Sequence, residues 1–334
     1  MTTKAMAVPS RQIAFVVDLN KCIGCQTCTV ACKRLWTGHP GQAFMYWRNV
    51  ETAPGQGYPR NWSAKGGGYK DGDLQKGKRP SAADYGIPFE FDYQGRLFEG
   101  KHDRARPTPT PHSAPNWDEE QGAGQYPNNH YFFLPRMCNH CSQPACLEAC
   151  PNDAIYRRVQ DGINVINLDK CKGTGSCVEA CPYGKSFLNM ADMKGNKCIG
   201  CYPRIEKGVA SACVAQCAGR AMHVGFLDDM NSSVHKLVNV FKVALPLYPE
   251  HGTKPNVFYI PPAFGPMVED AQGNPSMQSK IPLAYLEQLF GREVGGALAL
   301  LRAERGRKMS GMPSEVMDTM IGARSADMMI SPLT

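Results

Sequence analysis

Cysteine is the residue type in this sequence whose spacing most clearly predicts chemistry. The 334 residues contain 15 cysteines. They fall into four groups: Cys22, Cys25, Cys28 and Cys32; Cys138, Cys141, Cys146 and Cys150; Cys171, Cys177 and Cys181; and Cys198, Cys201, Cys213 and Cys217. Groups of closely spaced thiols are typical of iron–sulfur cluster ligands. The pattern therefore predicts four iron–sulfur centres, one of them with a ligand fewer than the others, and a role in electron transfer.

Disulfides and zinc sites are the two competing uses of so many cysteines. Fifteen is an odd number, and cysteines that are two residues apart rarely meet the geometry of a disulfide. Structural zinc sites usually combine two C-x2-C pairs separated by a dozen or more residues. The first group instead has the spacing C-x2-C-x2-C-x3-C. This is the pattern of bacterial ferredoxins, in which the last cysteine of a run binds the neighbouring cluster.

A repeated phrase marks the position of the missing ligand. Residues 20–25 read NKCIGC, and residues 196–201 repeat the same six letters. The third group reads DKCKGT over residues 169–174, with Thr174 where the second cysteine belongs. Iron prefers soft sulfur ligands to a neutral hydroxyl, so we expect a cube that lacks one corner, a [3Fe-4S] centre. The alternative is a four-iron cube in which Thr174 binds weakly or water completes the coordination.

One histidine lies inside a cysteine group. His140 stands between Cys138 and Cys141. We expect it to lie near a cluster and to affect its solvation, and replacement of a cysteine ligand by its imidazole is the alternative.

The charge balance fits buried anionic clusters. The formal net charge is +7 at pH 7. Three oxidised four-iron centres and one three-iron centre, with their thiolates, would add roughly −8 charges. We therefore expect much of the basic excess to offset the clusters, and no nucleic-acid partner. Four lysines flank predicted ligands and suit this interpretation, although solvated surface lysines are the alternative: Lys21, Lys170, Lys172 and Lys197.

Other function classes find little support in the sequence. No run of 18 apolar residues is present, so no membrane span is expected. No paired acids, nucleophile–base arrangement or nucleotide-binding motif stands out. We expect the chain to have no catalytic site of its own.

Short strands and helices are predicted around the cysteine groups. Strands are expected at residues 12–17, 154–159, 163–166 and 221–226, and short helices at 147–149 and 178–180. The Asp161-Gly162 turn predicts that the second and third of these strands form a hairpin. Towards the C-terminus, Asn231 is predicted to cap a helix, and residues 283–305 carry apolar residues at helical spacing.

The predicted fold class is α+β, with two bacterial-ferredoxin-like double-cluster modules, one inserted in the other. Residues 1–32 and 190–230 form the predicted outer module, and residues 138–189 the inner one. Residues 33–137 contain no cysteine and are predicted to form a loop-rich insertion. Their aromatic residues predict packing against another surface, so we expect an interface segment rather than a free linker. Residues 231–334 are predicted to form a helical C-terminal extension for subunit docking. The aromatic residues of the insertion are Trp36, Tyr46, Trp47, Trp62, Tyr85, Phe89 and Phe91.

Seven phrases of the sequence carry a resemblance to a known family. Four surround the cysteines: DLNKCIGCQTCTVACK, PRMCNHCSQPACLEACPNDAIY, DKCKGTGSCVEACPYGK and NKCIGCYPRIEKGVASACVAQC. Three lie in the insertion: YWRNVE (46–51), PFEFDY (88–93) and APNWDEEQGAGQYPNN (114–129). The chain resembles the iron–sulfur (beta) subunits of the dimethyl sulfoxide reductase family of molybdenum enzymes, in its periplasmic group. Residues 327–334 look most like the ethylbenzene dehydrogenase branch, which also contains steroid side-chain dehydrogenases.

The resemblance implies how the ligands are shared among four clusters. One [4Fe-4S] cluster, nearest the molybdenum subunit, takes Cys22, Cys25, Cys28 and Cys217. A second takes Cys198, Cys201, Cys213 and Cys32, and a third takes Cys138, Cys141, Cys146 and Cys181. The [3Fe-4S] cluster takes Cys150, Cys171 and Cys177. The related nitrate reductase subunit has tryptophan at the vacant position, where this chain has Thr174.

The resemblance also implies a function and partners. The chain is expected to be the electron-transfer subunit of a heterotrimeric molybdenum oxidoreductase. It would pass electrons singly between a catalytic alpha subunit, which holds molybdenum bis-guanine-dinucleotide, and a haem b gamma subunit. A hydrocarbon or steroid side-chain hydroxylating dehydrogenase is the specific expectation. The alternatives are the beta subunit of a selenate, chlorate or perchlorate reductase or of dimethylsulfide dehydrogenase, a freestanding polyferredoxin, and a zinc-binding structural or nucleic-acid protein.

Localisation rests on the same resemblance. Residues 1–12 lack an export signal. Members of the periplasmic group are exported with a partner that carries a twin-arginine signal, so the resemblance implies the periplasm. The cytoplasm is the alternative.

Overall fold

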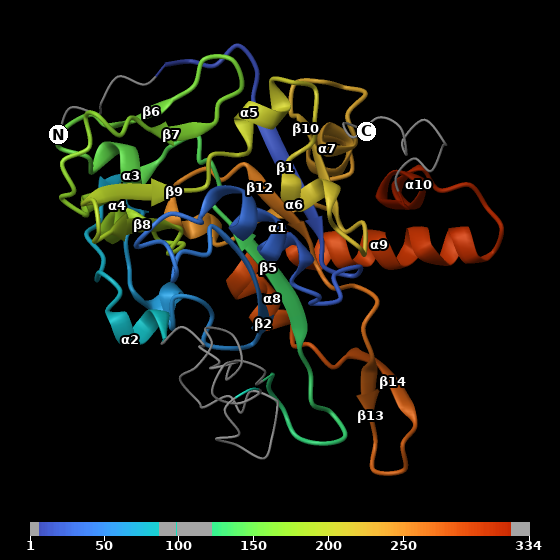
Figure 1. Ribbon diagram of the computed structural model, residues 1–334. Helices are drawn as coiled ribbons and strands as arrows, with labels where there is room; N and C mark the ends of the chain where they lie inside the picture. Colours follow the sequence, from blue (N-terminus) through green and yellow to red (C-terminus); the bar gives the residue numbers. More distant parts are fainter. Residues whose placement is uncertain (1–6, 87–97, 99–121, 322–334) are drawn as a thin grey trace.

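A mixed four-stranded sheet joins distant parts of the chain. The computed structural model describes residues 7–86, 98 and 122–321 (Figure 1). Strand β1 (Ile13–Asp18) pairs antiparallel with β10 (Met222–Phe226) and parallel with β12 (Val257–Ile260). Strand β11 (Leu245–Pro246) completes the order β10-β1-β12-β11. All six residues of β1 are buried, as expected for the nearly continuous apolar run IAFVV. The strands predicted at 12–17 and 221–226 are confirmed.

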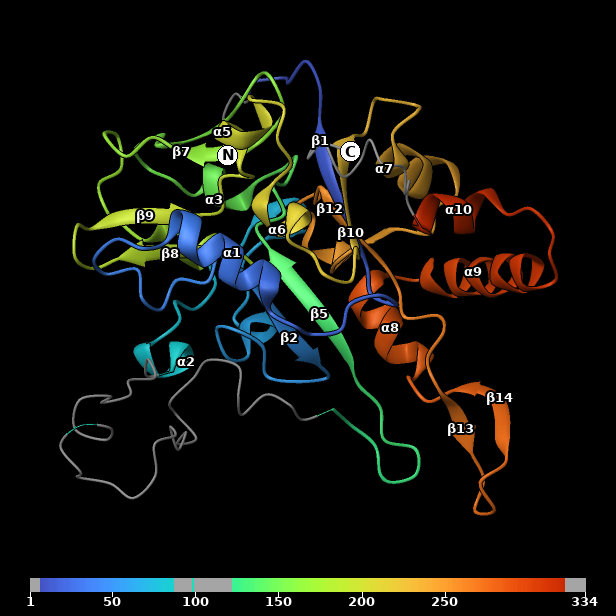
Figure 2. The ribbon, with the colours of Figure 1, turned by 45° about the vertical axis from the view of Figure 1, so that its right-hand side comes forward.

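A two-stranded antiparallel ribbon crosses the middle of the molecule (Figure 2). It consists of β2 (Arg48–Ala53) and β5 (Phe132–Met137), with Arg48 opposite Met137 and Asn49 opposite Arg136. Because side chains alternate along a strand, Arg48 and Asn49 point to opposite faces of the ribbon. Every residue of β2 is buried, so both faces contact other parts of the chain.

Short elements surround the cysteine groups. The helices are α1 (Thr27–Trp36), α3 (Ala145–Glu148), α4 (Ser176–Ala180), α5 (Tyr202–Ile205) and α6 (Ala212–Ala215). Two hairpins pair β6 (Ile155–Arg157) with β7 (Asn164–Ile166), and β8 (Ser186–Asn189) with β9 (Lys194–Lys197). The predicted hairpin around Asp161-Gly162 and the predicted short helices near 147–149 and 178–180 are confirmed.

The described part of the insertion packs on its own chain. It is less irregular than predicted, because both strands of the central ribbon, β2 and β5, lie in it. Its other elements are η1 (Trp62–Ala64), β3 (Tyr69–Lys70), β4 (Asp73–Leu74) and α2 (Ala82–Tyr85). Trp47 and Trp62 are buried in the core, and Trp36, Tyr46 and Tyr85 pack against it. Phe89, Phe91 and the phrase at 88–93 lie outside the described residues, as do 114–121 of the next phrase and the C-terminal residues 327–334. Contact with another subunit therefore stays a prediction for this segment.

The C-terminal part differs from the sequence prediction in three respects. It is not a purely helical extension, because its strand β12 lies inside the main sheet between β1 and β11. Ser232, not Asn231, caps helix α7 (Ser233–His235), because its hydroxyl accepts a hydrogen bond from the Val234 amide at 3.2 Å. The apolar stretch at 283–305 forms two helices, α8 (Leu283–Phe290) and α9 (Val294–Met309), because Gly291 between them adopts a φ of 82°. The remaining elements are η3 (Lys236–Val240), η4 (Pro249–His251), β13 (Met267–Glu269), β14 (Pro275–Ser279) and α10 (Glu315–Ile321).

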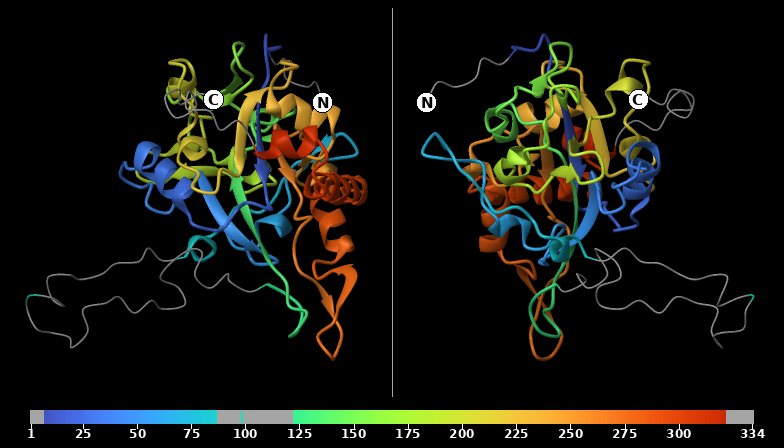
Figure 3. Two further views of the ribbon diagram at one scale, coloured as in Figure 1. Left: turned by 90° about the vertical axis from the view of Figure 1, so that its right-hand side faces the viewer. Right: turned by 60° about the vertical axis from the view of Figure 1, so that its left-hand side comes forward.

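The β13–β14 hairpin extends from one end of the molecule beside residues 122–131 (Figure 3). The Asn128 side chain ties the two together, since its Nδ2 donates to the Glu269 carbonyl at 2.9 Å and its Oδ1 accepts from the Glu269 amide at 2.8 Å. Among the residues that the structure describes, no helix has the length and apolar character needed to cross a membrane.

Candidate metal-cluster sites

The structure gathers cysteines from different sequence groups around three cavities. The first is lined by Cys22, Cys25, Cys28 and Cys217. The second is lined by Cys32, Cys198, Cys201 and Cys213. The third is lined by Cys150, Cys171 and Cys177, together with Thr174. These are the sets that the resemblance implies for the first, second and three-iron clusters, and in each set one cysteine comes from another group.

The other four cysteines also influence one another. Burial raises the pKa of Cys141, and the neighbouring Cys138 and Cys181 raise it further. Burial likewise raises the pKa of Cys146 and of Cys181, and Cys138 raises both further. Cys181 thus lies with the second group rather than only with its own. All 15 cysteines are free thiols in the structure.

The cysteine loops share one backbone feature. The residue before the second cysteine, or before Thr174 in the third group, has a positive φ in every group: 69° at Gly24, 42° at His140, 67° at Gly173 and 61° at Gly200. Glycine adopts this conformation at little cost, which explains the repeated glycine in the NKCIGC phrases. In the second group His140 takes the position that glycine has in the others. The residue with positive φ turns the backbone sharply beside the second position of each group.

Gly200→Ala tests this backbone requirement. At Gly200 an added Cβ would adopt an unfavourable φ and lie 2.8 Å from Cδ1 of Ile163. We expect the free energy of unfolding to fall by about 1–2 kcal/mol and cluster retention to fall with it. Urea unfolding followed by cluster absorbance measures the change. Gly38→Ala is the control, because nothing lies within 4 Å of a Cβ there; equal stability of the two variants would contradict the assignment.

His140 is neutral in its buried position. Burial lowers the pKa of His140 well below its ordinary value, and the Lys197 ammonium lowers it further. Its side chain is 1% exposed. The role of His140 beside a cluster stays a prediction. A ligand role for its imidazole stays an alternative.

Thr174 lines the third cavity, and its hydroxyl forms a hydrogen bond within the protein. Its Oγ1 accepts a hydrogen bond from Ser176 Oγ at 3.2 Å. The insertion contacts this site, because Arg79 donates from Nη2 to the Thr174 carbonyl at 2.9 Å and to Glu179 Oε1 at 2.9 Å. The hydroxyl therefore supports the start of helix α4.

The thiols need cations or metal to ionise. Burial raises the pKa of Cys22 to about 11 and that of Cys213 to about 12, although the nearby Arg48 guanidinium lowers both. At exposed Cys25 the Thr27 hydroxyl, which donates to Sγ at 3.3 Å, lowers the pKa. Since only thiolates bind metal, cluster binding must displace protons from the buried thiols.

Several sulfur atoms of the predicted ligands accept hydrogen bonds. The amides of Gly195, Gly200 and Ala221 donate to Sγ of Cys171, Cys198 and Cys217 at 3.2, 3.3 and 3.3 Å. The Trp36 indole donates to Cys201 Sγ at 3.1 Å. Such bonds stabilise a cluster with a net negative charge.

Of the four lysines that flank predicted ligands, one is fully buried. Lys197 donates to the Cys198 carbonyl at 3.0 Å and to the Asn164 carbonyl. Burial alone would lower the pKa of Lys197, but Cys138 and Cys146 outweigh it and raise the pKa. Lys21 is half-buried and donates to the Met320 carbonyl, whereas Lys170 and Lys172 are exposed to solvent. The donor set of thiols, amides and buried cations fits anionic iron–sulfur clusters.

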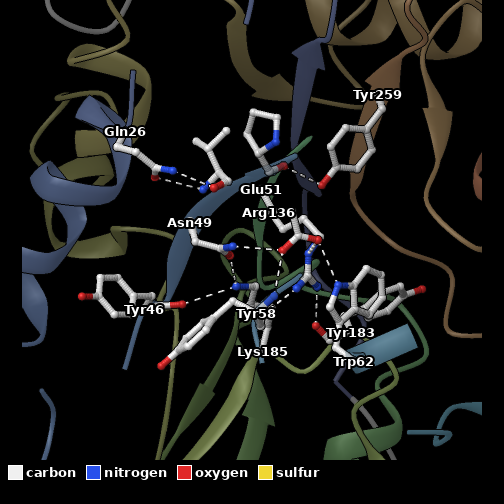
Figure 4. Close-up of polar contacts among 12 residues, drawn as sticks. Gln26, Tyr46, Asn49, Glu51, Tyr58, Trp62, Arg136, Tyr183, Lys185 and Tyr259 are labelled. Carbon is white, nitrogen blue, oxygen red and sulfur yellow. Dashed lines mark hydrogen bonds and ion pairs between the residues drawn. The ribbon is translucent and has the colours of Figure 1, made fainter. Parts of the chain in front are cut away.

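A buried polar network holds the loop after Cys181 against the central ribbon (Figure 4). Arg136 donates from Nε to Glu51 Oε1 at 2.6 Å, and its two other nitrogens donate to the carbonyls of Tyr183 and Tyr58 at 2.6 and 2.7 Å. Burial alone would raise the pKa of Glu51, but Arg136 and Lys185 outweigh it and lower the pKa. Lys185 Nζ donates to Asn49 Oδ1, and burial together with the Arg136 charge lowers the pKa of Lys185 well below its ordinary value. Sequence reasoning missed this network.

Comparisons with known proteins agree with this geometry. Residues 129–227 match the family model of a 4Fe-4S dicluster domain, and residues 19–42 match that of a 4Fe-4S binding domain. Together with the cysteine-lined cavities, these matches define an iron–sulfur protein built from ferredoxin-like domains. The nested arrangement of two modules remains an expectation.

Three relatives that match over nearly their whole length show to which family of iron–sulfur proteins the chain belongs. The chain is 69% identical to the perchlorate reductase subunit beta of Dechloromonas aromatica (strain RCB), over 98% of this chain and 99% of the relative. It is 52% identical to the dimethylsulfide dehydrogenase subunit beta of Rhodovulum sulfidophilum and 51% identical to the selenate reductase subunit beta of Thauera selenatis, each over 95% of this chain and 98% of the relative. The chain belongs to the iron–sulfur beta subunits of the dimethyl sulfoxide reductase family of molybdenum enzymes.

The family assignment confirms part of the sequence interpretation and corrects part of it. The chain is an electron-transfer subunit of an oxidoreductase complex, which implies a catalytic subunit as its partner. The expected hydrocarbon or steroid side-chain dehydrogenase branch is not supported, because these relatives are named for oxyanion reductases and dimethylsulfide dehydrogenase. The prediction of this branch depended on residues 327–334 alone, a short terminal stretch that lies outside the described part of the chain.

Proposed function

We propose that this chain relays electrons within an oxyanion reductase of the perchlorate and selenate reductase type. Identity of 69% over nearly the whole chain to a perchlorate reductase subunit beta supports this branch. The proposed partners are a molybdenum bis-guanine-dinucleotide catalytic subunit and a haem b subunit. The proposed location is the periplasm, reached by export with the catalytic subunit, and the cytoplasm is the alternative.

The proposed cofactors are three [4Fe-4S] clusters and one [3Fe-4S] cluster, bound by the four cysteine sets. The observation that carries this proposal is the convergence of cysteines from different groups on common cavities. When bound, such clusters accept and release one electron at a time. The chain's own residues hold the clusters, shield them from water and place amides and cations near their sulfur atoms.

The proposed architecture is two nested modules, with residues 1–32 and 190–230 enclosing 138–189. Two observations support the outer module. Strand β1 pairs with β10 and helix α1 contacts α6, and each of these contacts joins the N-terminal segment to residues 190–230. Residues 33–137 and 231–334 are proposed to contribute to subunit docking.

Metal analysis of the anaerobically isolated complex tests the proposal. We expect about 15 iron atoms per beta chain, in addition to the iron of the partner subunits, and signals from the four centres of this chain in electron paramagnetic resonance. Reduction of perchlorate or selenate by the complex tests the branch. Zinc in place of iron, or a fully loaded chain that is stable without partners, would contradict the proposal.

Thr174→Cys tests the vacant corner. A thiol at this position would supply the missing soft ligand, so we expect the three-iron signal of the oxidised complex to be replaced by a four-iron signal on reduction. Thr174→Ser is the control and should keep the three-iron signal. An unchanged spectrum in a fully loaded Thr174→Cys complex would rule out Thr174 as the empty corner.

A further inference from the structure

Arg48 lies between two of the cluster cavities. It is the first residue of β2, and of the residues that the structure describes it alone lines both the Cys22 cavity and the Cys198 cavity. Val50 and Pro135 line the Cys22 cavity beside it, as expected for residues on the same face of the ribbon. The side chain thus occupies the junction between two neighbouring sites.

The guanidinium of Arg48 has hydrogen-bonding capacity that its protein neighbours leave unused. Its side chain is 1% exposed, and its Nε and Nη1 atoms are buried without a hydrogen-bond partner. Its Nη2 donates to the thioether sulfur of Met222 at 3.0 Å, a weak acceptor. Within the described residues no carboxylate forms an ion pair with it.

Arg136 on the opposite face of the same ribbon provides a direct contrast. Arg136 is equally buried, but all three of its nitrogens donate to oxygen atoms and Glu51 neutralises its charge. A buried charge without a partner is strongly unfavourable. The ribbon therefore carries two buried arginines. The protein satisfies the hydrogen-bond donors of Arg136, whereas two donor nitrogens of Arg48 remain available to a bound group.

The negative charge available to Arg48 comes from the clusters that the cysteines would bind. The guanidinium of arginine stays protonated in proteins, whereas burial raises the pKa of the Cys213 thiol to about 12, so the free thiol is neutral. Cys28 lines the first cavity and Cys213 the second. A cluster bound by each set would hold these residues as thiolates, so the guanidinium would face negative charge on both sides.

We propose that Arg48 is a shared electrostatic and hydrogen-bonding partner of the two clusters bound by the Cys22 and Cys198 sets, and that it raises the reduction potentials of both. This inference rests on the proposed cluster assignment. A fixed positive charge favours the state with one more electron, and hydrogen bonds to sulfur act in the same direction. Arginine suits the position because its planar fork offers donors in several directions and stays charged.

Redox titration of the whole complex, followed by electron paramagnetic resonance, tests the inference. In Arg48→Met we expect the midpoint potentials of the Cys22 and Cys198 centres to fall by at least about 59 mV, which corresponds to a tenfold change in a one-electron equilibrium. The Cys138 and Cys171 centres should keep their wild-type potentials. Arg48→Lys keeps the charge but not the fork, so we expect smaller shifts at the same two centres.

Lys197→Met is the positional control. Its ammonium interacts with Cys138, Cys146 and Cys198, which belong to the second and third sets. We expect it to shift the Cys198 and Cys138 centres and to leave the Cys22 centre unchanged. Equal shifts at all four centres in Arg48→Met, or no shift at any, would overturn the role of Arg48.

Isotope labelling gives a second measurement that does not depend on the stability of Arg48→Met. The wild-type complex is prepared with arginine carrying 15N in the guanidinium. We expect pulsed electron paramagnetic resonance to detect 15N coupling at both reduced centres and to lose it in labelled Arg48→Lys. Absence of coupling at both centres of the wild type would also overturn the inference. Fewer than four centres in the wild type would instead overturn the proposed cluster assignment.

Discussion

Replacement of Glu51 by glutamine is expected to lower the free energy of unfolding by about 3–5 kcal/mol. The substitution removes the only carboxylate from a buried network that contains both Arg136 and Lys185, as far as the described residues show. The Arg136 charge would then be buried without an anionic partner. Because Arg136 also binds the Tyr183 carbonyl, next to the Cys181 loop, we expect early loss of the Cys138 centre. Urea unfolding of the purified complex, followed by cluster absorbance, measures both effects.

Glu315→Gln is the matched control for this prediction. It also breaks a carboxylate–cation pair, between Glu315 and Lys236 at 2.9 Å, but the Glu315 side chain is 66% exposed. Exposed pairs contribute at most about 1 kcal/mol, so the control should unfold almost like the wild type. Similar stability of Glu51→Gln and Glu315→Gln would show that the buried network does not stabilise the fold.

Cys217→Ala is expected to remove the same centre as Cys22→Ala, although the two residues belong to the last and the first sequence groups. Both line the first cavity. We expect each variant to hold about 11 iron atoms per beta chain instead of about 15, and to lose the same paramagnetic signal. The transfer of electrons to the catalytic subunit should fail in both, because the centre proposed to lie nearest molybdenum is missing.

Cys32→Ala and Cys198→Ala form the matched pair for the second cavity, which both residues line. We expect both variants to lose the same paramagnetic signal, and this signal should differ from the one lost in Cys217→Ala and Cys22→Ala. If each sequence group instead bound its own cluster, Cys217→Ala would match Cys198→Ala and Cys32→Ala would match Cys22→Ala. Such a pattern would refute the exchange of ligands between groups.

Local features of the fold could be predicted from the sequence because they depend on neighbouring residues. The Asp161-Gly162 turn between two short apolar runs predicts the β6–β7 hairpin, and the structure contains it. The short helices beside the cysteines follow from the same kind of local pattern. The break at Gly291 was missed because apolar residues keep helical spacing on both sides of it, while the positive φ of one glycine ends the helix.

Interactions between distant residues could not be predicted in the same way. Glu51 and Arg136 are 85 positions apart, and Asn49 and Lys185 are 136 positions apart. Neither pair leaves a periodic signal in the sequence. Arg48 is a similar case, because its importance depends on two cavities that form only when the first and the last cysteine groups fold together. The spacing of the cysteines predicted clusters, whereas the assignment of ligands to each cluster needed the family resemblance.

The position of Cys217 beside Cys22, Cys25 and Cys28 has a consequence for biosynthesis. The ribosome must release residue 217 before the N-terminal site has its full set of thiols. The sets that end at Cys177 and Cys181 are complete earlier, so the middle of the chain can receive iron while the N-terminal thiols still wait for their last neighbour. Completion of the N-terminal site therefore depends on nearly two thirds of the chain having been synthesised first.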